Sequence, residues 1–416
     1  MEKSRKPKIR FKGFTDDWEQ REFSEMFDCT IPNNTLSRSE LSYDEGSILN
    51  IHYGDILIKY GSILDIHKYE IPRIPNKKKE DFRGSLLQPG DIVIADTAED
   101  ETTGKACEIG SLFGNGVVAG LHTMVARPNI EMASGYLGYY LNSNAYHCQL
   151  LPMMQGIKVL SLSRANVKKT ALKFPQSIKE QQLIANYFIQ LDELITLHQR
   201  KLDKLINVKK SMLEKMFPKQ GSVVPEIRFG GFTDDWEQRE LGELYQKNTE
   251  KNEDLIGYDK TISIATMTYK GEGNGASDNS LRAYKVLRMG DLAFEGHTNK
   301  EFRYGRFVAN DIGIGIMSPR FSTLRPKNDM PIIFWKYYIH YEPVMKSVLV
   351  NSTKAGTMMN ELVISEFMTQ SIFIPSYEEQ KKIGAYLDQI DHLITLHQRV
   401  KSLRIDIVTK KGVLNN

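Results

Sequence analysis

Cysteine is scarce in this sequence, and the three residues present, Cys29, Cys107 and Cys148, include no Cys-x-x-Cys pair. Three cysteines are too few for a disulfide framework or a cysteine-rich zinc site. No apolar run approaches the roughly 18 to 20 residues of a membrane span, and no apolar segment follows the basic start MEKSRKPKIRF, as a signal peptide would require. We therefore expect a cytoplasmic protein of a reducing compartment that makes no contact with a membrane.

The usual sequence marks of catalysis are also missing. The chain has no G-x-x-x-x-G-K-[ST] phosphate loop, no G-x-G-x-x-G, no H-E-x-x-H and no G-x-S-x-G. Pro-Pro, which the aromatic tetrapeptides of amino-methyltransferases contain, does not occur. We interpret the acidic run at 98–105 as a solvated loop rather than a metal-binding carboxylate cluster, because only one half of the chain carries it. The sequence thus predicts no catalytic residue, no metal site and no cofactor bound by this chain.

Charge of one sign is not in excess, since 55 Lys and Arg stand against 52 Asp and Glu, a net charge of +3. This balance argues against a protein coated in positive charge, but local basic stretches can still face a polyanion. With 416 residues, 41% of them hydrophobic, the chain is expected to form two to four globular domains.

The chain does contain two long internal repeats. Residues 9–27 (IRFKGFTDDWEQREFSEMF) and 227–245 (IRFGGFTDDWEQRELGELY) are identical at 14 of 19 positions. Residues 180–200 (EQQLIANYFIQLDELITLHQR) and 379–399 (EQKKIGAYLDQIDHLITLHQR) are identical at 13 of 21. The offsets of about 200 residues are too long for a solenoid and indicate two tandem copies of a domain with a connector.

The second repeat predicts a long helix in each half. Residues 176–217 contain no Gly or Pro and lie between Pro175 and Pro218. Apolar residues recur there at heptad spacing, which is typical of a coiled coil: the seam is Ile184, Leu191, His198, Leu205 and Met212, flanked by Tyr187, Phe188, Leu194, Ile195, Leu202, Val208 and Met216. A helix of that length would span about 60 Å, too long to pack on one small domain, so we expect the two long helices to pair as antiparallel partners.

The C-terminal copy continues the same pattern with a break near its end. Its seam holds Ile383, Ile390 and His397, and the stripe is interrupted at Arg404. His198 and His397 occupy equivalent seam positions. We interpret them as polar residues that fix the helix register, with a metal ligand or a catalytic base as the alternative.

Between the repeats lie two modules, 28–175 and 246–375, that share only a skeleton. Each has a turn and apolar strand (89–96 and 289–296), a strand ending in Arg-Pro (122–128 and 320–326), an aromatic helix (135–143 and 333–341), a Gly-containing loop (154–163 and 354–365) and an apolar strand ending in proline. The fold class expected is α+β, with two mixed modules, two long helices and a pseudo-two-fold repeat. The predicted domains are 1–175, 176–217, 218–375 and 376–416.

The repeated marks RFxGFTDDWEQRE and P-x(3,4)-EQ-x(2)-I-x(2)-Y-x(3)-D-x-LITLHQR, in this order, resemble the specificity subunit of type I restriction-modification systems over essentially the whole chain. The resemblance implies that each module is a target-recognition domain for one half of a bipartite site in double-stranded DNA. It further implies that the long helices dock two methyltransferase subunits and set the spacer of the site. Two restriction (translocase and nuclease) subunits complete such a complex, and S-adenosylmethionine, ATP and Mg²⁺ belong to the partner subunits.

Clusters of basic residues in the modules are the candidate DNA contacts. The first module carries Arg73, Lys77, Lys78, Lys79 and Arg83 in one loop, and Lys158, Arg164, Lys168, Lys169 and Lys173 in a stretch without acidic residues. The second carries Lys270, Arg282, Lys285, Arg288, Lys300, Arg303, Arg306 and Lys354. Such side chains anchor phosphates, and Arg reads base edges in the major groove. For any one of them, a solvated surface cation is the competing interpretation.

Two alternatives stay open at this point. Trp18 and Trp236, each preceded by Thr-Asp-Asp, are interpreted as core anchors where each module begins, with a protein-docking surface as the alternative. The rival to a non-catalytic DNA-recognition subunit is a fused DNA methyltransferase or nuclease with its own specificity domains. Binding of S-adenosylmethionine by the purified chain would distinguish the two.

Overall fold

The computed structural model describes residues 7, 9–219, 221–270, 278–356 and 359–410, except for the side chains of 278–279 and 400–410. The chain divides into two compact units, unit 1 (residues 1–197 and 403–416) and unit 2 (residues 198–402). The division falls within the first long helix, whereas the sequence placed the domain limits at the helix ends. No helix in the described part of the chain is both long enough and apolar enough to cross a membrane.

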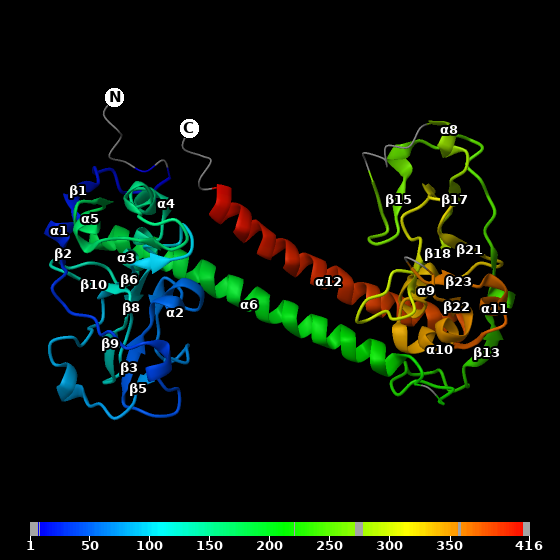
Figure 1. Cartoon of the computed structure of the whole chain (residues 1–416), viewed down its shortest axis with the longest axis horizontal. Coiled ribbons are helices and arrows are strands. Elements are labelled where there is room, and N and C mark those ends of the chain that lie inside the picture. Colours follow the sequence, from blue (N-terminus) through cyan, green and yellow to red (C-terminus); the bar gives the residue numbers. More distant parts are fainter. Residues whose placement is uncertain (1–6, 8, 220, 271–277, 357–358, 411–416) are drawn as a thin grey trace. The chain divides into compact units, whose positions relative to one another are not determined.

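Unit 1 is built on a five-stranded sheet of order β2-β10-β6-β8-β4, beside which lie a three-stranded sheet β5-β3-β9 and the pairs β1-β12 and β11-β7 (Figure 1). Its elements are β1 (Glu19–Glu22), α1 (Phe23–Met26), β2 (Phe27–Asp28), η1 (Arg38–Glu40), β3 (Ile48–Ile51), α2 (Tyr53–Ile58), β4 (Ile63–Leu64), β5 (Arg73–Ile74), η2 (Lys79–Phe82), β6 (Ile92–Ala95), β7 (Thr97–Ala98), β8 (Ala106–Ile109), β9 (Gly116–Ala119), β10 (Thr123–Pro128), α3 (Tyr136–Leu141), α4 (Asn144–His147), η3 (Leu151–Met153), β11 (Leu160–Ser161), α5 (Arg164–Lys168), β12 (Ala171–Phe174) and α6 (Ile178–Met216), which continues into unit 2.

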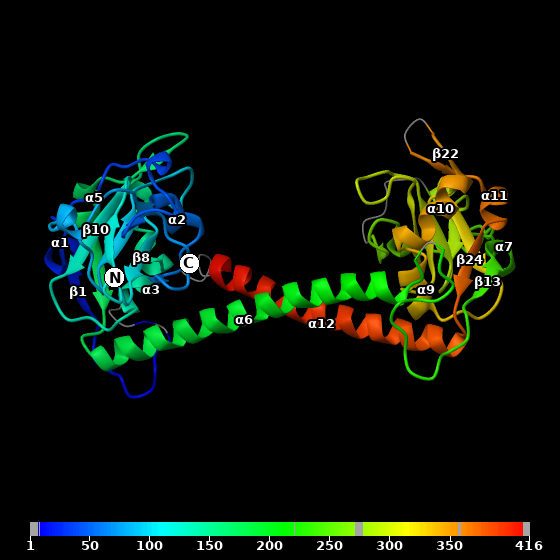
Figure 2. The same ribbon diagram turned by 90° about the horizontal axis from the view of Figure 1, so that it is seen from below.

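Unit 2 repeats this plan with a four-stranded sheet of order β14-β21-β18-β19 and the pairs β13-β24, β15-β16, β17-β20 and β22-β23. Strands β13 and β24 lie side by side at the edge of the unit (Figure 2). Its elements are β13 (Glu237–Glu240), α7 (Leu241–Leu244), β14 (Tyr245–Lys247), η4 (Tyr258–Lys260), β15 (Ile262–Ser263), β16 (Thr268–Tyr269), α8 (Asp278–Leu281), β17 (Lys285–Leu287), β18 (Leu292–Glu295), β19 (Arg306–Ala309), β20 (Gly315–Met317), β21 (Ser322–Pro326), α9 (Ile332–Tyr338), α10 (Glu342–Ser352), β22 (Thr353–Lys354), β23 (Glu361–Leu362), α11 (Ile364–Met368), β24 (Ser371–Ile374) and α12 (Tyr377–Lys410).

The strand after each Gly-Asp turn is buried on both faces and divides its unit into two cores. In β6, Ile92 and Ile94 belong to the core beside α3 and the start of α6, whereas Val93 and Ala95 belong to the core of β3 and β9. In β18, Leu292 belongs to the core beside α9 and the start of α12, whereas Ala293 belongs to the core of β15 and β20. Successive side chains on a strand point to opposite faces, which explains this alternation. In each unit, the scaffold part is the part around the core that includes the repeated segments, with Phe23 and Leu172 in unit 1 and Leu241 and Leu387 in unit 2. The distal part is the part around the other core, that of β3 and β9 in unit 1 and that of β15 and β20 in unit 2.

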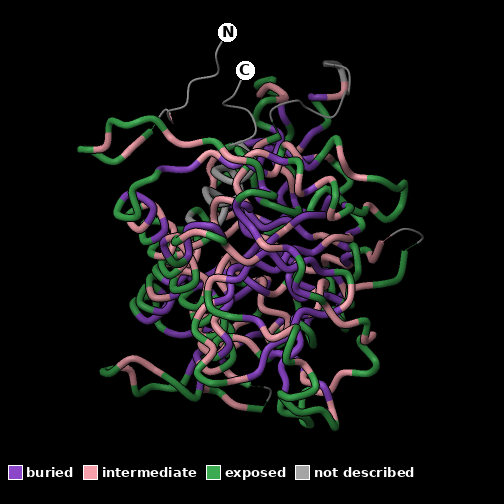
Figure 3. The backbone as a smooth tube through the Cα atoms, turned by 90° about the vertical axis from the view of Figure 1, so that its left-hand side faces the viewer, coloured by how far each residue is buried: buried purple, intermediate pink, exposed green. Residues whose placement is uncertain are grey.

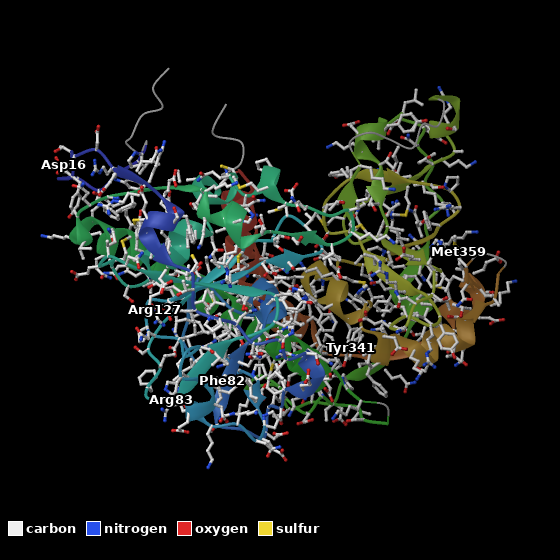
Figure 4. All side chains as sticks on the ribbon, turned by 60° about the vertical axis from the view of Figure 1, so that its left-hand side comes forward. Asp16, Phe82, Arg83, Arg127, Tyr341 and Met359 are labelled. Carbon is white, nitrogen blue, oxygen red and sulfur yellow. The ribbon has the colours of Figure 1, made fainter. Side chains whose placement is uncertain are left out.

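Burial follows this division into cores and connecting loops. Many buried segments run through the interior of the trace, and many exposed segments are peripheral loops (Figure 3). In unit 1, Asp16 of the repeated segment and Arg83 of the distal part lie at opposite ends of the unit (Figure 4). The distal loops therefore lie away from the residues that the two halves share.

The predicted α+β class, with two mixed modules and two long helices, is confirmed. The first long helix spans Ile178–Met216 and the second Tyr377–Lys410, against predictions of 176–217 and 376–416. One predicted strand is wrong in its start: 320–326 begins only at Ser322, because Arg320 lies in a turn closed by the hydrogen bond from Phe321 N to Ser318 O.

The heptad stripe is less completely covered than its pattern suggested. Leu202 and Met216 are buried, but Tyr187 and Leu194 of the predicted stripe are about half exposed. On α12, Ile383, Leu387 and Ile390 are buried, whereas Leu393 is exposed. The predicted break at Arg404 concerns a side chain outside the described ones.

Candidate nucleic-acid interface

The two sequence repeats meet in space within each unit. Arg10 of the first repeated segment donates from Nε and Nη2 to Glu180 at 2.6 and 2.7 Å, and Arg228 donates in the same way to Glu379 at 2.7 and 2.8 Å. Both glutamates are almost fully buried near the start of a long helix. Each bidentate pair therefore ties a repeated segment to its long helix. Strand pairing adds to this tie, since β1 pairs with β12 and β13 with β24 in antiparallel register.

The aromatic helix of each module is attached to the long helix by an equivalent hydrogen bond. The Tyr139 hydroxyl donates to Asp192 at 2.9 Å, and the Tyr337 hydroxyl donates to Asp391 at 2.7 Å. The edge-on ring contact of Phe11 with Tyr187 also has a counterpart, between Phe229 and Tyr386. The long helices are thus held against the modules by residues that occur in both halves.

A buried aspartate fixes the middle of each module. Asp91 accepts two hydrogen bonds of 2.7 Å from Arg127, and Asp291 accepts hydrogen bonds of 3.0 and 2.7 Å from Arg325. Both aspartates follow a glycine with positive φ, at +89° and +87°, a conformation that glycine adopts without strain. The Asp of each Gly-Asp turn therefore pairs with the Arg of the following Arg-Pro strand end. This contact connects β6 to β10 in unit 1 and β18 to β21 in unit 2.

The first cluster of predicted DNA contacts lies in the distal part of unit 1, on β5, η2 and the loop around them. The side chains of Lys77, Lys78, Lys79 and Arg83 are exposed, and Phe82 lies beside Arg83 at the far end of the unit (Figure 4). The cluster also contains acids, since Asp81 caps the backbone of Lys78. Two of its cations have protein acceptors: Arg73 donates to Gly46 O at 3.3 Å and Lys79 to Gly114 O at 2.9 Å.

The second cluster of unit 1 is divided by the fold. Arg164 at the start of α5 is half-buried and donates to Cys29 O at 2.8 Å, which fastens α5 to the strand β2 region. Lys168 is half-buried on the same helix, close enough to Cys29 to act on its pKa, although burial dominates and raises the pKa of that thiol. Lys158, in contrast, is exposed in the loop before β11. Arg164 thus serves the packing of the scaffold part, and Lys158 is the better placed of the three for an external ligand.

In unit 2 as well, some of the predicted cations bind to other groups of the protein and the others are exposed. Lys285 is half-buried with a pKa lowered by burial, and it donates to Phe321 O at 2.6 Å. Arg306 forms an ion pair of 2.6 Å with Glu295. Arg288 pairs with Glu250 at 2.7 Å. The remaining predicted contacts are exposed: Lys270, Arg282, Lys300, Arg303 and Lys354.

A hollow of about 460 Å³ opens in the distal part of unit 2, at the end of β18. Its lining combines three basic side chains, one carboxylate, hydroxyls and apolar residues: Thr261, Ile262, Ser263, Ile264, Ala265, Lys270, Glu295, His297, Ser318, Arg320 and Phe321. Sequence reasoning found only Lys270 among them. Arg320 stands within the predicted strand, and Glu295 is acidic, whereas the sequence pattern predicted DNA contacts from clusters of basic residues.

The long helices contact one another within unit 2. The Nδ1 atoms of His198 and His397 lie 2.8 Å apart, and Lys209 pairs with Asp391 at 2.6 Å. A step forward on α6 thus corresponds to a step backward on α12, so the helices are antiparallel here. One imidazole donates and the other accepts, and both are half-buried. The described residues contain no group of three or more His, Cys, Asp or Glu side chains that could hold a metal ion.

Apolar side chains nevertheless remain exposed at equivalent positions of both helices. Leu194 and Leu197 on α6 are 52% and 48% exposed, and Leu393 and Leu396 on α12 are both 43% exposed. These four leucines belong to the two copies of LITLHQR. We call them the leucine pairs of α6 and α12.

Comparison with known proteins places the chain. A curated protein of Methanocaldococcus jannaschii, described as a type I restriction enzyme MjaX specificity subunit, is 23% identical over 210 residues, which are 45% of this chain and 47% of that relative. The match thus spans about half the length of that relative. A crystal structure of the S subunit of a type I restriction-modification system from M. genitalium has a similar fold, with a TM-score of 0.54 at 13% identity, covering 97% of this chain and 98% of that one.

The family comparison covers more than half of the sequence and both units. The model of the type I restriction modification DNA specificity domain matches residues 15–207 and again 298–403. These two stretches contain the buried Glu180 and Glu379 and both copies of LITLHQR. The chain belongs to the family of type I restriction-modification DNA specificity domains.

Proposed function

We propose that this chain is the non-catalytic DNA-recognition subunit of a type I restriction-modification complex, and that each distal part reads one half of a bipartite site in double-stranded DNA. The observation that carries the proposal is the repetition of the scaffold contacts, Arg10–Glu180 and Arg228–Glu379, beneath two distal parts of different sequence. Equal scaffolds with unequal distal parts suit a ligand whose two halves differ. Exposed cations in both distal parts supply the electrostatic attraction that DNA requires.

The proposal extends to two methyltransferase subunits, each docked on one copy of the repeated helix. The leucine pairs support it, because exposed leucines on a helix surface gain free energy when a partner covers them. They occur at equivalent positions of α6 and α12, so the two partners would be equivalent as well. Two restriction subunits complete the complex, and S-adenosylmethionine, ATP and Mg²⁺ bind to the partners rather than to this chain.

Native mass spectrometry of the co-expressed complex tests the docking. We expect two methyltransferase subunits per chain, and one in each of the variants Leu194→Asp and Leu393→Asp, because a charge in the apolar contact is costly. Thr196→Asp and Thr395→Asp are the matched controls, because both threonines are exposed and each donates to the backbone carbonyl four residues earlier. A saturated complex with a single methyltransferase in the unmodified chain would contradict the proposal.

We further propose that the long helices set the spacer between the two half-sites. Inserting four residues after Arg200 adds about 6 Å of helix, which corresponds to roughly two base pairs at about 3.4 Å each. The methylated site should then have a longer spacer and unchanged half-sequences. The insertion also rotates the following residues by about 40°, so a partial loss of activity is compatible with the proposal. Methylation at the original spacer length would contradict it.

A further inference from the structure

We propose that the hollow at the end of β18 is a base-reading site, in which Glu295 accepts a hydrogen bond from the exocyclic amino group of a cytosine or adenine and Arg320 contacts the same segment of DNA. The inference rests on the proposed function and names the residues that carry it in unit 2. It also differs from the sequence-based expectation, since neither residue belongs to the predicted set of DNA contacts.

The Glu295 carboxylate is held in place as an acceptor. By strand alternation, Glu295 lies on the same face of β18 as Ala293, which belongs to the distal core. Arg306 donates from Nε to the Glu295 carboxylate at 2.6 Å, and the Glu295 side chain is only 13% exposed. Oxygen lone pairs beyond those used by Arg306 remain available on the carboxylate.

A fixed carboxylate discriminates between the parts of DNA. It repels phosphates, but it accepts hydrogen bonds from base amino groups, the contact that Glu and Asp make with cytosine N4. The pairing with Arg306 also offsets the negative charge, so that approach to DNA is not opposed. We therefore assign Glu295 to a base edge and not to the backbone.

Cationic and hydroxyl groups surround this acceptor. Lys270, His297 and Arg320 are exposed at the hollow, and the Arg320 guanidinium lies 4.6 Å from the centre of the Phe321 ring, which orients it. The Thr261 hydroxyl in the lining is buried and has no hydrogen-bond partner among the described residues. The volume of about 460 Å³ lies within the range of small-ligand pockets and admits a group of nucleobase size.

The same strand end in unit 1 is built differently, because the position that corresponds to Glu295 is Ala95. Directly after β6 stands another carboxylate, Asp96, whose Oδ1 accepts from Thr97 Oγ1 at 2.8 Å and lies 3.6 Å from His122 Nδ1. The His122 ring in turn contacts Tyr53 edge-on, with 5.3 Å between ring centres. The carboxylate of unit 1 thus stands one residue further along the chain than that of unit 2, and its neighbours are different, which suits two modules that read different half-sites.

Methylome sequencing of a host that carries the complete complex tests the inference, with Glu295→Ala, which removes the acceptor oxygens, and Arg320→Ala as variants. At one position of one half-site, we expect both variants to lower the preference for the recognised base pair over the other base pairs by about tenfold. The other half-site should be unchanged. Relaxation at a C·G pair assigns cytosine to Glu295, and relaxation at an A·T pair assigns adenine. Glu366→Ala and Lys346→Ala, exposed in the scaffold part of unit 2, are the controls and should leave both half-sites unchanged.

The outcomes separate this inference from the function on which it rests. An unmodified chain that methylates a bipartite site, with both half-sites unchanged in the two variants, would overturn the base-reading site alone. Absence of any bipartite methylation with the unmodified chain would overturn the proposed function and the inference together. Because Glu295 also pairs with Arg306, thermal unfolding is measured for its variant, and the exposed Arg320 decides the matter if Glu295→Ala does not fold.

Discussion

The two units use the same contacts in their scaffold parts and different architectures in their distal parts. The pairs Arg10–Glu180 and Arg228–Glu379 differ by about 0.1 Å in donor–acceptor distance. The distal part of unit 1 instead contains a three-stranded sheet, whereas that of unit 2 contains two-stranded pairs. The buried ion pairs therefore support the scaffold part independently of the architecture of the distal part.

Even the identical residues of the repeats are not in identical surroundings. Trp236 is 3% exposed and packs edge-on against Phe334 and Tyr338, whereas Trp18 is half-buried and its indole donates to Glu180 at 3.4 Å. The end of α6 precedes the second segment and contributes Phe217 to the same core. The interpretation of both tryptophans as core anchors is therefore confirmed for Trp236 and wrong for Trp18, which is only half-buried.

We expect the largest loss of stability when one arginine of a scaffold ion pair is removed. Arg228→Ala leaves the carboxylate of Glu379, which is 0% exposed, without its charge partner, and we expect the free energy of unfolding of unit 2 to fall by about 3 to 5 kcal/mol. Arg10→Ala should destabilise unit 1 in the same direction through Glu180. Denaturant unfolding, followed for each unit by hydrogen exchange, measures both effects.

The control for this prediction removes both charges. The double variant Arg228→Met with Glu379→Leu should regain most of the lost stability, because replacing a buried ion pair with apolar residues is far less costly than orphaning one partner. If Arg228→Ala unfolds at the same denaturant concentration as the unmodified chain, the pair is not what holds the segment to its helix.

A smaller effect distinguishes unit 2 from unit 1. Hydrogen bonds from Arg288, and then from Arg325, lower the pKa of Glu250 from 4.5 to about 2. A depressed carboxylate pKa stabilises the fold fully above the ordinary value and loses this contribution as the pH falls from about 4.5 toward 2. Allowing for solvent screening at this partly exposed site, we expect Glu250→Gln to cost unit 2 about 1 kcal/mol at neutral pH.

The measurement is the unfolding free energy of Glu250→Gln and of the unmodified chain between pH 7 and pH 3. Their difference should shrink as the pH falls, and Glu253→Gln, an exposed residue nearby in the sequence, should show no such dependence. A difference that grows on acidification would show that the Arg288 and Arg325 contacts do not depress this pKa.

What the sequence predicted well depends on local pattern. The long helices follow from the absence of Gly and Pro between two prolines, and the skeleton strands follow from apolar runs beside turns. The contact of His198 with His397 could be expected because the two occupy equivalent seam positions. Their role in fixing register stays a prediction.

What the sequence could not predict depends on distance in space. Glu180 and Arg10 are 170 residues apart in the chain, and no pattern announces that they form a pair. Arg164 and Lys285 look like any surface cation in the sequence, but backbone carbonyls of distant residues accept their hydrogen bonds. The sequence thus shows which side chains are cationic. Only the fold shows which of these cations already donate their hydrogen bonds to another part of the protein.

The exchange of one module tests the central claim most directly. Residues 246–375 would be replaced by the corresponding module of a related subunit, a limit that leaves Arg228 and Glu379 in place to hold the new module. Methylome sequencing of a host carrying the hybrid complex should show a site in which one half-sequence is new and the other half-sequence is unchanged. A hybrid that changes both half-sequences, or neither, while still methylating DNA would contradict independent reading of the two halves by the two units.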